Sequence, residues 1–82
     1  MSRLKRPTHP MPPDVDEALR RGGALVAYRE RPAYQRNDYL GWIGRAQQGE
    51  TRTKRIHQMV AELREGGVYM GMPHPPSRRR PG

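Results

Sequence analysis

The residues best suited to binding chemistry lie together in the stretch Arg52-Thr53-Lys54-Arg55. Guanidinium and ammonium groups bind phosphate and carboxylate oxygens, and the free N–H groups in the first turn of a helix favour the same anions. A glycine-containing turn precedes the stretch and an apolar helical pattern follows it, which is the outline of a helix-turn-helix. The stretch is therefore a candidate for binding an anion or a partner, and its alternative interpretation is the solvated surface of a helical bundle.

The helical wheel distinguishes these two interpretations. At about 100° per residue, Arg52 falls beside the apolar stripe, whereas Lys54 and Arg55 point to opposite solvent sides. A helix that reads DNA would direct such side chains to one exposed face, so the pattern favours the bundle surface. In that interpretation the Arg52 guanidinium binds the carboxylate of Glu50 or Asp38 and fixes the turn between two helices. We therefore expect Arg52→Ala to destabilise the protein more than Lys54→Ala.

No other residues suggest catalysis or a metal site. The chain has no cysteine, and His9, His57 and His74 lie far apart without the spacing of metal ligands. The acids around Asp14 fall at a helix start, where carboxylates are favoured by the helix dipole. We therefore expect no enzymatic activity, no cofactor and no metal.

Glycine and proline divide the middle of the chain into helical segments. We expect helices over residues 13–21, 24–31 and 35–47, and a last helix that begins at a Thr51 N-cap and ends before Gly66. No alternating run is long enough for a sheet. The expected fold class is all-α, a small bundle of about four helices over residues 13–72.

The apolar positions predict which side chains form the interior. In the third segment Tyr39 and Ile43 share one stripe, and in the fourth the stripe begins at Ile56 and repeats at helical spacing. The expected core consists of Leu19, Leu25, Tyr28, Tyr39, Leu40, Trp42, Ile43, Ile56, Met59, Val60 and Leu63. So small a core leaves both a monomer and a weak homodimer open.

Gly41 and Gly44 lie together on the side of the third segment opposite the apolar stripe. Each costs roughly 1 kcal/mol relative to alanine inside a helix, so a close neighbour would explain both. We hypothesise that residues 68–72 fold back across this side. Tolerance of exposed glycine is the alternative.

The positive charge is concentrated near the chain ends. The formal net charge is +8, but six of the sixteen Lys and Arg lie outside residues 11–74, where ten remain against eight Asp and Glu. We expect flexible basic, proline-rich arms over residues 1–12 and 73–82. One interpretation is that they attract an anionic partner such as nucleic acid or a membrane surface, and the alternative is that they reflect solubility and a compositional bias towards arginine and proline. No apolar run could span a bilayer and no secretory signal is evident, so a cytoplasmic location is expected.

Several elements follow one another in a specific order between residues 32 and 67. They are Arg36-Asn37-Asp38-Tyr39-Leu40, Trp42-Ile43, Glu50-Thr51-Arg52, Lys54-Arg55-Ile56 and the helix end from Leu63 to Gly66. In this order they resemble the helical domain of the YdeI/OmpD-associated, or bacteriocin-protection, family. The resemblance implies a helical bundle and a link to envelope stress and antimicrobial-peptide tolerance, and it carries over no catalytic residues.

The expected function is a non-enzymatic bacterial binding or stress-associated module. The alternative is a small nucleic-acid-binding protein of the helix-turn-helix kind, with the Thr51–Arg55 stretch at the start of its contacting helix. Salt-dependent binding of residues 11–74 to duplex DNA distinguishes the two, because only the nucleic-acid-binding alternative requires it.

Overall fold

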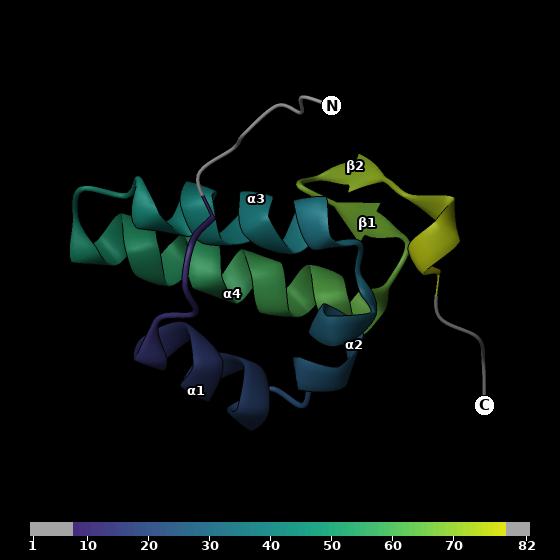
Figure 1. Cartoon of the computed structure of the whole chain (residues 1–82), viewed down its shortest axis with the longest axis horizontal. Coiled ribbons are helices and arrows are strands. Elements are labelled where there is room, and N and C mark those ends of the chain that lie inside the picture. The colour runs from purple at the N-terminus through teal and green to yellow at the C-terminus, as the bar shows by residue number, and fades with distance from the viewer. Residues whose placement is uncertain (1–7, 79–82) are drawn as a thin grey trace, which may run out of the picture.

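The structure is a computed structural model that describes residues 8–78, in which four α-helices precede a β-hairpin. The elements are α1 (Pro13–Arg21), α2 (Leu25–Glu30), α3 (Ala33–Gly44), α4 (Gly49–Glu65), β1 (Val68–Tyr69), β2 (Met72–Pro73) and the 3₁₀ helix η1 (Pro75–Ser77). α3 and α4 lie side by side and antiparallel, with α1 packed on α4 and the hairpin beside the last turns of α4 (Figure 1).

α1 follows its sequence signals closely. Pro13 occupies the first turn, Asp14 and Asp16 lie near its positive end, and Arg20 and Arg21 lie in its last turn. The predicted span of residues 13–21 is confirmed. The chain then turns at Gly23, whose φ of +67° is adopted far more readily by glycine than by other residues.

The ends of the other helices differ from the prediction. α2 is shorter by one residue at each end, and α3 begins directly after Pro32 and ends at Gly44 instead of residue 47. The Thr51 N-cap is wrong, because α4 begins at Gly49 and the Arg52 amide already donates to the Gln48 carbonyl, at 2.9 Å. The error arises because a helix can start on backbone and solvent bonds alone, without a side-chain cap.

The hairpin corrects the predicted fold class. The protein is mostly helical, as expected, but Tyr69 pairs with Met72 and Val68 with Pro73 in a two-stranded antiparallel sheet. Both residues of the turn, Met70 and Gly71, have positive φ angles of 53° and 79°. Such a turn matches the twist of the two strands it joins. The strands are too short to produce an alternating pattern, so no sequence signal marked them.

Most of the predicted core is confirmed. Leu19, Tyr28, Tyr39, Leu40, Ile43, Ile56, Met59 and Leu63 are buried. Leu25, Trp42 and Val60 were predicted to be core residues but are only partly buried at its edge. Val15, Ala24 and Ala27 complete the apolar interior, and Arg31, Gln35 and Glu62 are buried polar side chains that the apolar pattern did not identify.

The hypothesis that residues 68–72 cover Gly41 and Gly44 is wrong. A β-carbon built on Gly41 would lie 2.8 Å from Nε2 of His9, and one built on Gly44 would have no neighbour within 4 Å. The segment before α1 therefore covers Gly41, and the His9 amide donates to Oδ1 of Asn37 at 2.8 Å. Figure 1 shows this segment crossing α3 on its way to α1.

The two glycines are expected to respond differently to alanine. Gly44→Ala should raise the free energy of unfolding by about 0.5 kcal/mol, because it restricts the unfolded chain and meets no neighbour. Gly41→Ala should gain nothing, because the new methyl group displaces the His9 ring. Urea unfolding of both variants measures the difference. Equal stabilisation would show that the segment before α1 does not lie on α3.

The predicted arms fall partly outside the described residues. Residues 1–7 and 79–82 lie beyond them. The described remainder of each arm contacts the rest of the molecule. The His9 amide donates to Asn37 on α3, and Oγ of Ser77 accepts from the amide of Gly67, which lies between α4 and β1, at 3.1 Å.

Candidate binding sites around the hairpin

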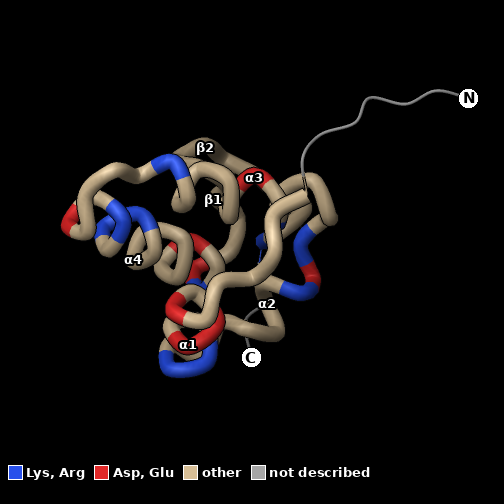
Figure 2. The backbone as a smooth tube through the Cα atoms, turned by 60° about the vertical axis from the view of Figure 1, so that its left-hand side comes forward, with Lys and Arg blue, Asp and Glu red and all other residues tan. Residues whose placement is uncertain are grey.

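The structure distributes the four candidate residues at the start of α4 among different surroundings. Arg52 turns toward α1, Lys54 reaches back to Glu50 at 3.9 Å, and Thr53 is exposed. Arg55 turns instead toward α3. Figure 2 shows the Lys and Arg positions scattered over several elements rather than gathered on one face.

Arg52 pairs with a different carboxylate from the two predicted. Its Nε and one terminal nitrogen both donate to Asp14, at 2.9 Å each, so Arg52 joins α4 to the first turn of α1. The predicted pairing with Glu50 or Asp38 is wrong, because α1 packs on α4 at this point. These hydrogen bonds hold the pKa of Asp14 below its usual value, although partial burial acts in the opposite direction.

We still expect Arg52→Ala to destabilise the protein more than Lys54→Ala. Two matched hydrogen bonds between elements should contribute up to about 1 kcal/mol at this partly exposed site, and the long Lys54 pair almost nothing. Because the pKa of Asp14 is lower in the folded state, this contribution is present at neutral pH and is lost as the pH falls through that lowered value. Urea unfolding at pH 7 and below pH 3 tests both statements, and equal effects of the two substitutions at pH 7 would refute the role of Arg52.

The Arg55 side chain contacts Trp42 on α3. One of its terminal nitrogens donates to the Trp42 carbonyl at 2.7 Å, and its guanidinium carbon lies 5.3 Å from the centre of the Trp42 ring. The carbonyls in the last turn of a helix lack hydrogen-bond donors within that helix, and Arg55 supplies a donor to one of them. The cation–π contact also explains how the half-buried indole is covered.

A buried carboxylate on α4 organises the opposite end of the molecule. Glu62 is 7% exposed, and its Oε1 accepts hydrogen bonds from the Tyr39 hydroxyl at 2.5 Å and the Met70 amide at 2.8 Å. Its Oε2 accepts from the Gly71 amide at 2.7 Å and from the Gln58 side chain at 3.0 Å. Glu62 and these four donors, which we call the Glu62 cluster, join the hairpin turn to α3 and α4.

The same cluster changes the acidity of Tyr39. Burial raises the pKa of the Tyr39 hydroxyl strongly, and the hydrogen bond to Glu62 and the charge of that carboxylate raise it further. The phenol therefore stays a donor to Glu62 at neutral and moderately alkaline pH. The geometry is that of a structural contact, since every carboxylate oxygen is already engaged.

A second polar chain holds the segment after the hairpin. Arg31 donates to Oε1 of Gln35 at 3.1 Å and to the Val68 carbonyl at 2.9 Å. The Gln35 amide nitrogen lies 3.0 Å from Nε2 of His74, and the His74 backbone amide donates to the Gly67 carbonyl at 2.7 Å. Because Arg31 fixes the orientation of the Gln35 side chain, the His74 ring accepts the hydrogen bond from that amide.

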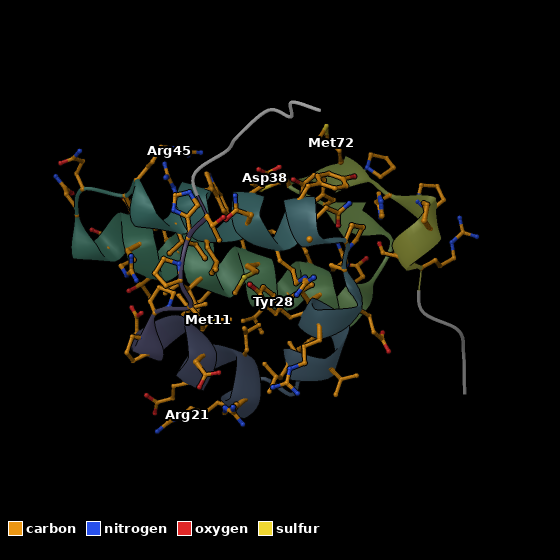
Figure 3. The ribbon with its side chains drawn as sticks, viewed as in Figure 1. Met11, Arg21, Tyr28, Asp38, Arg45 and Met72 are labelled. Carbon is orange, nitrogen blue, oxygen red and sulfur yellow. The ribbon has the colours of Figure 1, made fainter. Side chains whose placement is uncertain are left out.

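Above these buried groups lies an exposed surface formed by Tyr34, Tyr69 and Met72, which we call the hairpin-end surface. Tyr69 stacks edge-on against Tyr34, with 6.2 Å between ring centres, and pairs with Met72 across the hairpin. Its hydroxyl donates to Asp38 at 2.7 Å. Figure 3 shows Asp38 and Met72 on the same side of the molecule.

The described residues also form a cleft of about 400 Å³ between α2, the end of α4 and η1. Ala27, Leu63 and Pro76 provide apolar walls, and the lining is completed by polar and charged residues, namely Glu30, Arg31, Ser77 and Arg78. Neither the cleft nor the hairpin-end surface was identified from the sequence. The sequence signals were indirect: Glu62 lies beside the apolar stripe of α4, Arg31 follows α2, and Tyr69 comes shortly after Gly66 and Gly67.

Two further properties concern the described residues as a whole. No group of three or more His, Asp or Glu within residues 8–78 is arranged to hold a metal ion. None of the helices in the same range is both long and apolar enough to cross a membrane.

The fold and these surfaces define a small, mostly helical domain with a hairpin attached through buried polar groups. A family model described as bacteriocin-protection, YdeI or OmpD-associated matches residues 8–66. The protein belongs to this family, which confirms the resemblance and extends it over α1, α2 and the segment that covers Gly41. Neither the curated proteins nor the solved structures gave a match.

Proposed function

We propose that this protein is a non-enzymatic binding module that acts in bacterial stress tolerance, and that the hairpin-end surface contacts its protein partner. The family description links its members to protection against bacteriocins, which supports a role in stress tolerance. The observation that carries the proposal is the exposure of two large apolar side chains beside Tyr69, namely Tyr34 at 53% and Met72 at 56%. Aromatic residues and methionine are enriched at protein interfaces.

The buried groups beneath this surface support the proposal. Tyr69 is fixed by its hydrogen bond to Asp38 and by edge-on contact with Tyr39, with 5.5 Å between ring centres. The Glu62 cluster fixes the adjoining turn. A surface held in one conformation loses little entropy when a partner binds, so each contact contributes more to affinity.

The hairpin is poorly suited to binding by strand addition. Pro73 has no N–H to offer a further strand, and the Val68 carbonyl already accepts a hydrogen bond from Arg31. We therefore propose that side chains, rather than the strand edge, recognise the partner.

Affinity capture with the native chain tests this function. The double variant Tyr34→Ser/Met72→Ser should lose the captured partner protein, because both exposed contacts become small and polar. The matched control is Val26→Ser, since Val26 is the other large apolar side chain that is well exposed in residues 8–78, at 65%, and lies on α2. Capture that survives the double variant, or that depends on Val26, would contradict the proposal.

No observation in residues 8–78 favours the alternative function of nucleic-acid binding. Arg52 donates to Asp14 and Arg55 donates to the Trp42 carbonyl. Of the four candidate binding residues, Thr53 and Lys54 are the exposed ones. The alternative predicts salt-dependent binding to duplex DNA that weakens when Lys54 is replaced by alanine. The proposed function predicts no such change.

A further inference from the structure

Arg31 carries a buried positive charge with no acidic partner among the described residues. Arg31 is only 5% exposed, and none of the ion pairs within residues 8–78 includes its side chain. Its acceptors are neutral: the Gln35 side chain and the carbonyls of Val68 and Glu62. Neutral carbonyls hydrogen-bond the guanidinium but do not neutralise it, and burial of an unneutralised charge is unfavourable.

The same residue lines the cleft between α2, α4 and η1. The polar part of the lining consists of Glu30, Arg31, Ser77 and Arg78, so two cations face one carboxylate. The apolar part consists of Ala27, Leu63 and Pro76. A ligand that complements this lining carries one negative charge and an apolar body.

We propose that the cleft binds a small aliphatic monocarboxylate. The carboxylate lies between Arg31 and Arg78, and the alkyl chain lies against Ala27, Leu63 and Pro76. The volume of about 400 Å³ falls within the range of roughly 300–1,000 Å³ found for small-molecule sites. This site is separate from the hairpin-end surface and does not depend on the function proposed for that surface.

Glu30 sets the charge that the cleft accepts. Its carboxylate reduces the net charge of the lining to that of one cation, which suits a monoanion and disfavours a dianion such as inorganic phosphate. Glu30→Gln should therefore strengthen monocarboxylate binding several-fold. Arg78→Ala should weaken it several-fold, because it removes a cation from the lining.

Titration of the full chain with acetate, butyrate, hexanoate and inorganic phosphate tests the site. Two-dimensional ¹H–¹⁵N NMR spectra recorded at each ligand concentration monitor the binding. We expect saturable shifts at the Ser77 and Arg78 amides and at the Arg31 Nε–H. Affinity should rise from acetate to hexanoate by up to about fourfold per buried methylene. Phosphate should bind more weakly than hexanoate.

The variants distinguish specific binding in the cleft from non-specific attraction of anions to a positively charged protein. Glu30→Gln and Arg78→Ala leave Arg31 and its hydrogen bonds in place, so they preserve the fold. Arg64→Ala is the matched control, because Arg64 is exposed on α4 and does not line the cleft. Affinities that respond to Arg64 as much as to Arg78, shifts that never saturate, or phosphate binding tighter than hexanoate would each overturn the proposal.

Discussion

Glu62→Ala is expected to lower the free energy of unfolding by about 3–5 kcal/mol. The substitution leaves the Tyr39 hydroxyl and the Met70 and Gly71 amides without their acceptor. The buried Tyr39 hydroxyl costs most, because a bond to a charged group contributes about 1.5–3 kcal/mol and no water replaces it. The two part-buried amides add roughly 1 kcal/mol each, and the small core offers little reserve. Urea unfolding followed by circular dichroism measures the loss.

Two further variants make this result interpretable. Glu62→Gln keeps the shape and one acceptor oxygen, so it should fold and lose about half as much stability. Glu65→Ala is the matched control on the same helix; Glu65 is exposed, and its removal should change stability by less than about 0.5 kcal/mol. Similar losses for Glu62→Ala and Glu65→Ala would show that the Glu62 cluster does not stabilise the fold.

Tyr39→Phe is expected to lower the free energy of unfolding by about 2 kcal/mol. The substitution preserves the buried ring and removes only the hydroxyl, whose acceptor is a buried carboxylate, and hydrogen bonds to charged groups contribute about 1.5–3 kcal/mol. Tyr34→Phe is the control on the same helix. The Tyr34 hydroxyl accepts from Gln35 on a side chain that is 53% exposed, so water can replace it.

The Tyr39 variant also tests the cluster as a unit. Combined with Glu62→Gln, its effect should be clearly less than additive, because both substitutions act on the same charge-assisted hydrogen bond. Additive losses would mean that Tyr39 and Glu62 stabilise the protein independently, contrary to the contact between them.

The sequence predicted best what depends on neighbouring residues. The structure confirms two such local patterns. One is the start of α1 at Pro13 with acids in its first turn, and the other is the buried stripe of Ile56, Met59 and Leu63 on α4. Trp42 was placed in the interior from its position on the helical wheel alone. Its indole is only partly buried at the edge of the core, and the charged Arg55 guanidinium of α4 lies over the ring.

What the sequence could not predict depends on contacts between distant segments. Arg52 was correctly placed beside the apolar stripe, but its partner Asp14 is 38 residues away and could be identified only once α1 was known to pack on α4. In the same way, the acceptor of the Gly71 amide is a side chain on the preceding helix. The two-residue strands leave no periodic signal, so the hairpin and its surface were missed.

The binding stretch predicted from charge illustrates the same limit. Arg52, Lys54 and Arg55 are adjacent along the chain, yet in the structure they contact α1, the start of α4 and α3 respectively. Cations that lie close together along the chain therefore do not form one common surface in the structure. The proposed sites instead combine residues from the first half of the chain with residues from the last turn of α4 onward.

The central claim is that Glu62 holds the hairpin turn against the helices and so builds the hairpin-end surface. Native-state hydrogen exchange at the Met70 and Gly71 amides tests it most directly, with the helical Met59 amide as internal reference. We predict that both turn amides exchange far more slowly than unprotected amides in the native chain, and that Glu62→Gln accelerates their exchange while Met59 remains protected. Turn amides that exchange at unprotected rates in the native chain would contradict the account.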